Sequence, residues 1–177
     1  MRTLLFILSL LWAAHAGAQP LGDINKYLQH RGVHAGAKDY YNEVRKAGVD
    51  SFTTRIADSL QTRNNATRPF YMLLVSRMLM YADAGLATML FDDCYKVLEK
   101  RPNELVEFLY NSNNLVYTDY RNYWAGAIVG YIGKEHRSET LEFFGKLRPK
   151  LMKTCKKHNK ANMTAFLDSI SAGLTPQ

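Results

Sequence analysis

The chain has 177 residues, of which 47% are hydrophobic and 22% are charged, and its formal net charge is +7. This composition is typical of a globular domain and excludes an intrinsically disordered chain, which would have far fewer apolar residues. The length suits one domain with a core of its own, and the positive charge favours acidic partners.

The first eighteen residues have the pattern of a secretory signal peptide. Arg2 provides a positive start, residues 4–14 form an apolar run of eleven, and Ala16 and Ala18 are small residues at the −3 and −1 positions of a cleavage site. The run is too short for a membrane anchor, because a membrane span takes roughly 20 apolar residues. We therefore expect cleavage after Ala18, a single domain at residues 19–177 with no transmembrane anchor, and a periplasmic or secreted location.

Apolar residues recur at helical spacing through most of the remaining chain, and no segment has a convincing strand pattern. The expected helices are, in chain order, residues 23–30, 37–47, 51–63, 69–82, 86–100, 102–110, 120–133, 139–157 with a kink or restart at Pro149, and 161–172. We expect an all-α fold of about 7–9 helices. It would be an irregular helical bundle or a short stack of antiparallel helix pairs, similar to HEAT or TPR repeats.

Two features of these helices bear on the arrangement. Residues 69–82 are apolar on most sides, so this helix is expected at the centre of the core. Arg68-Pro69 and Arg101-Pro102 lie 33 residues apart and each opens a helix, which is the spacing of a two-helix repeat. No third copy appears at residue 134, so the bundle and the repeat stack both remain open.

Two cysteines, Cys94 and Cys155, fall on apolar helical faces. An exported protein meets an oxidising environment, so an even number of cysteines favours a disulfide. We expect a Cys94–Cys155 bond, with two separate buried thiols as the alternative.

Aromatic residues are concentrated among polar residues between positions 110 and 124. Tyrosine, tryptophan and arginine supply much of the binding energy in protein interfaces, so this segment is a candidate interface. The alternative is that its aromatic residues pack inward at helical spacing. The interface residues would be Tyr110, Tyr117, Tyr120, Arg121, Tyr123 and Trp124.

A basic run lies toward the C-terminus, with no acid between Glu142 and Asp168. Helical spacing predicts a basic face opposite the apolar side of this helix. Its residues are Lys146, Lys150, Lys153 and Lys157. Such a face suits an acidic protein, or anionic lipid or polysaccharide, and its simpler interpretation is a solvated helix surface. The export signal argues against nucleic acid as the partner.

Motifs for catalysis and metal binding are missing from the sequence. There is no G-x-S-x-G elbow, no S-x-x-K set and no glycine-rich phosphate loop. His30 and His34 have the spacing of two ligands on one helix face, but Gly32 lies between them and no glutamate follows His30. We expect no catalytic residue, no metal and no cofactor.

The sequence therefore predicts an exported, non-catalytic protein-binding module. The most concrete hypothesis is an immunity-type inhibitor that neutralises a secreted cell-wall-degrading toxin by occluding its active site, with an acidic partner. The alternative is a binder of anionic envelope material through the basic face, and a hydrolase with a dispersed active site ranks third. An exposed tyrosine-rich patch would also serve a homodimer.

Overall fold

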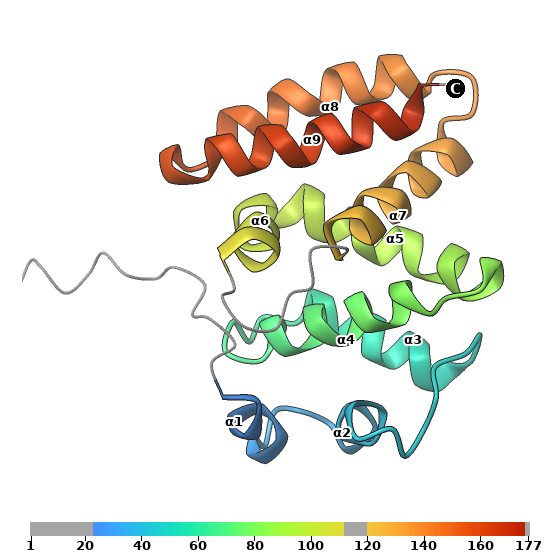
Figure 1. The fold of residues 1–177 in the computed structure, drawn as a ribbon, viewed down its shortest axis with the longest axis vertical. Helices are drawn as coiled ribbons and strands as arrows, with labels where there is room; N and C mark the ends of the chain where they lie inside the picture. The colour runs from blue at the N-terminus through green and yellow to red at the C-terminus, as the bar shows by residue number, and fades with distance from the viewer. Residues whose placement is uncertain (1–22, 112–119, 176–177) are drawn as a thin grey trace, which may run out of the picture.

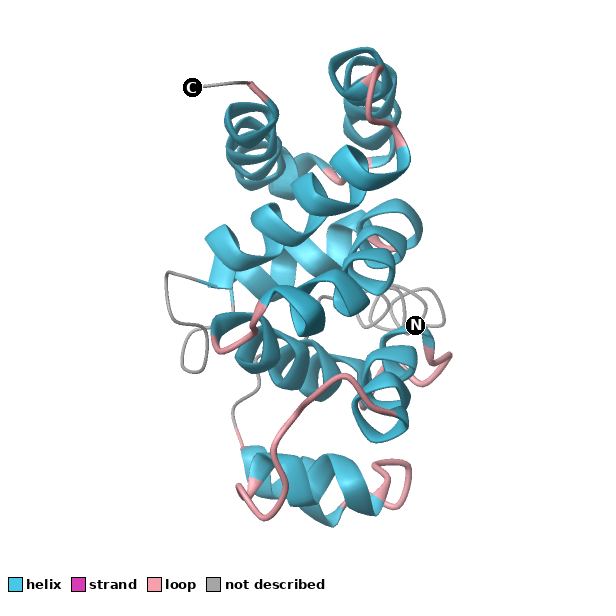
Figure 2. Cartoon of the chain, turned by 90° about the vertical axis from the view of Figure 1, so that its right-hand side faces the viewer, coloured by secondary structure: helices cyan, strands magenta, loops and turns pink. Residues whose placement is uncertain are grey.

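The computed structural model describes residues 23–111 and 120–175, and all regular secondary structure within these ranges is helical. The elements are α1 (Ile24–Gln29), α2 (Ala35–Tyr41), α3 (Ser51–Asp58), the 3-10 helix η1 (Ser59–Gln61), α4 (Arg68–Met80), α5 (Ala84–Lys100), α6 (Pro102–Asn111), α7 (Tyr120–Glu135), α8 (Thr140–Thr154), the 3-10 helix η2 (Lys157–Asn159) and α9 (Lys160–Leu174). They stack in layers along the long axis, from α1 and α2 at one end to the α8–α9 hairpin at the other (Figures 1 and 2). The predicted all-α helical bundle is confirmed.

Several helix starts follow directly from the sequence. The Asp50 carboxylate accepts a hydrogen bond from the Thr53 backbone N–H at 2.8 Å, as expected of an N-cap, and α3 begins at the next residue. Asp83 caps α5 in the same way through the N–H of Leu86. Pro69 lies in the first turn of α4, where a missing N–H has no cost.

Two helices that are apolar on most sides form the centre of the core. Almost all side chains of α4 are buried, as predicted, and α7 packs against α4, α5 and α9. The Trp124 indole of α7 is fully buried, and its N–H donates to the Ser76 hydroxyl of α4 at 2.8 Å. This bond satisfies the one polar group that the indole carries into the core.

The two Arg-Pro pairs that suggested a repeat meet at one backbone group. Arg68 donates to the Thr62 carbonyl oxygen from Nη2 at 2.6 Å, and Arg101 donates to the same oxygen from Nη2 at 3.4 Å. The buried Arg68 guanidinium also forms an ion pair with Glu104 of α6. Both arginines therefore bind the turn that precedes α4. Through this shared contact, the two Arg-Pro pairs connect the start of α4 with the start of α6.

Helix α2 ends at Tyr41, six residues before the predicted end at residue 47. A contact from α4 replaces the next turn. The Arg77 guanidinium donates to the Tyr41 carbonyl oxygen at 3.2 Å and pairs with the Glu43 carboxylate at 3.1 Å. Glu43 adopts a left-handed backbone with φ of 61°, which turns the chain out of the helix.

Helix α8 is continuous through Pro149 and ends earlier than predicted. It runs through Pro149 without a restart and ends at Thr154, so Lys157 lies beyond it in η2. The proline ring would collide with the carbonyl of residue i−4, which here belongs to the exposed Gly145. Gly145 has no side chain, and a Cβ atom there would meet no atom within 4 Å, so this part of α8 is not crowded by neighbouring elements.

Candidate binding surface

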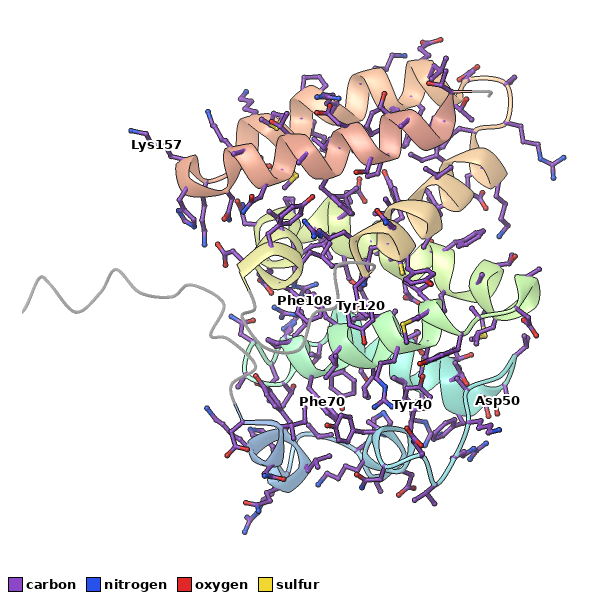
Figure 3. The ribbon with its side chains drawn as sticks, in the orientation of Figure 1. Tyr40, Asp50, Phe70, Phe108, Tyr120 and Lys157 are labelled. Atoms are coloured by element: carbon purple, nitrogen blue, oxygen red, sulfur yellow. The ribbon has the colours of Figure 1, made fainter. Side chains whose placement is uncertain are left out.

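The aromatic segment predicted as an interface is largely committed to the core. Tyr120 and Trp124 are buried, and in Figure 3 Tyr120 lies in the interior between the layers. Their assignment as interface residues was therefore wrong, and their inward packing at helical spacing agrees with the alternative. Packing against α4 removes the rings of Tyr120 and Trp124 from water, which is more favourable than leaving them exposed in a loop.

The other members of that segment that the structure describes are Tyr110, Arg121 and Tyr123, and none of them is buried. The guanidinium carbon of Arg121 lies 4.9 Å from the centre of the Tyr110 ring, a cation–π contact between α7 and α6. Tyr123 is the one clearly exposed tyrosine among the described members of the segment, and Tyr117 lies outside the described residues.

Cys94 and Cys155 are free thiols, each buried, so the predicted disulfide is not confirmed. Both lie on apolar faces as expected, but α5 packs mainly on α7 whereas α8 packs mainly on α9. Burial raises the pKa of both thiols, which keeps them protonated and makes them poor nucleophiles. They are core residues in this structure.

Part of the predicted basic face is neutralised by acids of the same domain. Lys146 pairs with Glu142 at 2.6 Å, one turn away on α8. Lys150 lies 3.4 Å from Glu99 at the end of α5. Arg148, on the same helix, binds Asp168 of α9 at 2.6 Å. The middle of α8 therefore offers little unbalanced charge to a partner.

The positive charge is concentrated instead where α8 turns into α9. We call this group the basic tip, and its residues are Lys153, Lys156, Lys157, His158 and Lys160. All five side chains are exposed, and Lys157 projects from the end of the hairpin, away from the body (Figure 3). Lys153, Lys157 and Lys160 take part in no ion pair with any described residue. Three unbalanced ammonium groups thus lie within eight residues of sequence.

A buried carboxylate on α6 holds the turn in place. The Glu107 side chain is only 5% exposed, and Lys156 Nζ and His158 Nε2 each lie 3.2 Å from its Oε1 atom. The buried Asn159 amide donates to the same oxygen at 2.8 Å. Asn103, one turn earlier on α6, accepts from the Lys156 backbone N–H at 2.8 Å and donates to the Thr154 carbonyl.

Residues of α6 therefore hold the turn in place, while Lys153, Lys157 and Lys160 have no acid partner among the described residues. Such a preformed group of exposed ammonium donors binds carboxylate or phosphate oxygens without first ordering a loop. The sequence indicated the lysines but not Glu107, since a lone glutamate on an apolar helix resembles any solvated carboxylate until α6 is placed against the hairpin.

The histidines, which could be metal ligands, make other contacts in this structure: two bind the backbone nearby and one stacks on an aromatic ring. His34 caps α2 through Nδ1, which accepts from the Ala37 N–H at 3.0 Å, and His30 Nδ1 accepts from the Gly32 N–H at 2.9 Å. His136 stacks on Phe143. Across residues 23–111 and 120–175, no three His, Cys, Asp or Glu side chains come together as a metal site.

One carboxylate has a strongly shifted pKa. Burial in α5 raises the pKa of Asp93 to about 6, the nearby Lys96 opposes this shift, and Asp58 and Asp92 add to it. A shifted acid is a feature of catalytic sites, but it also occurs in structural ones. The charged groups identified around Asp93 are two further carboxylates and a lysine, which form no nucleophile–base arrangement.

Comparisons with protein-family models, with curated proteins and with solved structures find no match to this chain. Among the helices described, none combines the length and the apolar character needed to cross a membrane. The surface of the domain is therefore the guide to its function.

Proposed function

We propose that this chain is a non-catalytic binding protein that recognises an acidic surface of another protein through the basic tip. The observation that carries the proposal is the group of three exposed lysines, Lys153, Lys157 and Lys160, that have no acid partner within the described residues. Of the other lysines on α8, Lys146 and Lys150 are paired with acids, so the unbalanced charge of this helix lies at the end that leads into the turn.

The electrostatics favour a partner with several carboxylates close together. One exposed ion pair contributes only about 0.2–1 kcal/mol, so a single acid would not hold the complex. Three such pairs, formed from a turn that is already ordered, give useful affinity and a fast association rate. Salt screens exposed pairs, which makes the interaction sensitive to ionic strength.

The most concrete version remains an immunity-type inhibitor, exported to the periplasm, that occludes the active site of a secreted cell-wall-degrading toxin. The support for this version is the predicted signal peptide together with a rigid, projecting basic turn that fits an acidic catalytic cleft. It requires that the complex block hydrolysis of cell-wall material by the partner.

The test measures binding of the chain to fluorescent poly-L-glutamate at low and high salt. We expect binding at low salt that weakens steeply as salt is added. Reversing the charge of Lys153, Lys157 and Lys160 to glutamate should weaken it by at least about tenfold, since three favourable pairs become three repulsions.

The control reverses three exposed bases elsewhere, Lys26, Arg31 and Arg63, which changes the net charge by the same amount. This variant should bind poly-L-glutamate nearly as well as the parent chain. Equal losses in both variants would show that net charge alone acts, and the proposal would be wrong.

A binder of anionic envelope material is the second candidate, and the same exposed lysines favour it. The basic tip has no apolar anchor among its own residues, which weakens the membrane version. Vesicles containing phosphatidylglycerol and an acidic polysaccharide serve as parallel probes. Tighter, tip-dependent binding to either of them than to poly-L-glutamate would replace the protein partner by that polymer or lipid.

A further inference from the structure

The three most exposed large apolar side chains of the described residues come from two neighbouring connections, on the side of the molecule away from the basic tip. Val44, Val49 and Tyr81 are 76%, 68% and 75% exposed. We call these three residues the apolar edge. Val44 and Val49 belong to the α2–α3 connection, and Tyr81 follows the end of α4. In Figure 1 the α2–α3 connection and the α4–α5 turn lie on the same side of the molecule.

Contacts from α4 and α5 hold this connection rigidly. The Arg77 guanidinium binds the Tyr41 carbonyl oxygen and the Glu43 carboxylate, one helical turn before Tyr81. Val49 packs over Gly85 so closely that a Cβ atom at Gly85 would come within 3.3 Å of its Cγ2. The Gly48 N–H also donates to the Thr53 hydroxyl at 3.0 Å. The apolar side chains are thus presented by an ordered backbone, and association would not have to order a loop.

The charges around the apolar edge are balanced, unlike those of the chain as a whole. Within residues 43–50 and 77–83 there are three acids and three bases, Glu43, Asp50, Asp83, Arg45, Lys46 and Arg77. Two ion pairs already join them, Arg45 with Asp50 at 3.2 Å and Arg77 with Glu43 at 3.1 Å. This part of the surface is electrically neutral in a chain with a net charge of +7.

Charge balance distinguishes between the partners this surface can accept. A neutral rim exerts no net electrostatic attraction on an acidic partner, whereas the basic tip does. A second copy of this chain carries the same net positive charge, and a neutral face is an approach at which this charge does not oppose association. A two-fold contact places the same patch on both sides, so each copy offers acids to the bases of the other.

We propose that the apolar edge is the face through which two copies of this chain associate. Each copy covers Val44, Val49 and Tyr81 of the other, with the mixed charges forming the rim. The patch is small beside a standard interface of about 800 Å² per partner, so the dimer is reversible at micromolar concentration. The inference is independent of the proposed function, because it rests on other residues and on another part of the molecule.

The experiment is sedimentation velocity of the full chain from about 5 to about 500 µM, a range that spans micromolar dissociation constants. We expect a concentration-dependent shift from monomer to dimer. The double variant Val44→Asp/Val49→Asp should remain monomeric throughout, because it brings like charges together across the two-fold contact. The control Leu141→Asp alters another exposed apolar residue, on α8, and should dimerise normally.

A mixing arm tests whether the contact is between identical faces. Val44→Lys/Val49→Lys should also be monomeric alone, and an equimolar mixture with the Asp variant should restore the dimer. A parent chain that stays monomeric throughout, or an Asp variant that still dimerises, would overturn the proposal. Monomeric behaviour of the parent chain would leave the apolar edge to a different protein.

Discussion

At the scale of single residues, the buried polar groups of this domain differ in how many hydrogen-bond or charged partners offset their loss of contact with water. Trp124 and Ser76 satisfy each other, and Ser76 in turn donates to the Met72 carbonyl at 2.7 Å. Glu107 has three donors around one oxygen. Asp93 lacks this support: its charged neighbours include two carboxylates, and burial raises its pKa to about 6.

Asp93 should therefore make stability depend on pH in a defined direction. Its folded pKa of about 6 lies above the ordinary 3.8, so between these values the folded state binds the extra proton. The contribution of Asp93 to stability is consequently favourable at low pH and is lost as pH rises through 6. Asp93→Asn should raise the free energy of unfolding at pH 7 by about 2 kcal/mol, and the gain should vanish near pH 4.

Urea unfolding at several pH values checks this expectation. Asp92→Asn is the matched control, because the neighbouring carboxylate is exposed and already paired with Lys96. It should give much less gain at pH 7 than Asp93→Asn, since Asp92 makes the smallest contribution to the shift of the Asp93 pKa and its loss also removes the pair with Lys96. A pH-independent effect of Asp93→Asn would show that the buried charge is not the cause.

At the scale of elements, the close approach of α5 and α7 depends on one glycine. A methyl group at Gly130 of α7 would collide with the ring of Phe91 on α5. Gly126, one turn earlier on the same helix, has no atom within 4 Å of the corresponding position. The two glycines share a helix and differ only in what faces them.

Alanine at these two positions should act in opposite directions. Gly126→Ala should stabilise the domain by about 0.5–1 kcal/mol, the ordinary gain in helix propensity. Gly130→Ala should destabilise it by about 1–3 kcal/mol, since the Phe91 ring must move within a packed layer. Thermal unfolding measures both changes, and Phe91→Leu should make Gly130→Ala better tolerated. Equal gains at both glycines would show that the two helices move apart without cost.

At the scale of the whole molecule, the sequence predicted what local chemistry determines and missed what packing determines. Periodicity, Asp50 and Pro69 were enough to predict the all-α fold and most helix starts. The early end of α2 depends on Arg77, which is 36 residues away from the carbonyl it binds.

The candidate site divides in the same way. The lysines of the basic run were evident, but which of them have an acid partner depends in part on Glu99, which binds Lys150 from another helix. By sequence, Tyr120 and Trp124 suited either a surface or a core, and their burial, with the bond from Trp124 to Ser76 of α4, decides for the core. The predicted disulfide is not confirmed, because the apolar faces that carry Cys94 and Cys155 pack mainly against other helices.

The two proposed surfaces occupy different ends of the layered stack, which gives the last prediction. If both proposals hold, a dimer carries two basic tips that face away from the shared apolar edge.

The monomeric Val44→Asp/Val49→Asp variant should bind a short soluble glutamate peptide within about twofold of the parent chain, because distant sites act independently. On a layer of long, flexible poly-L-glutamate chains, which can reach both tips although these face away from the contact, it should bind at least about tenfold more weakly, because only the dimer can attach by both tips at once. Surface plasmon resonance with the layer, and fluorescence anisotropy with the peptide, separate these effects. Equal weakening with both probes would mean that the apolar edge belongs to the anion-binding surface and that the two sites are not independent.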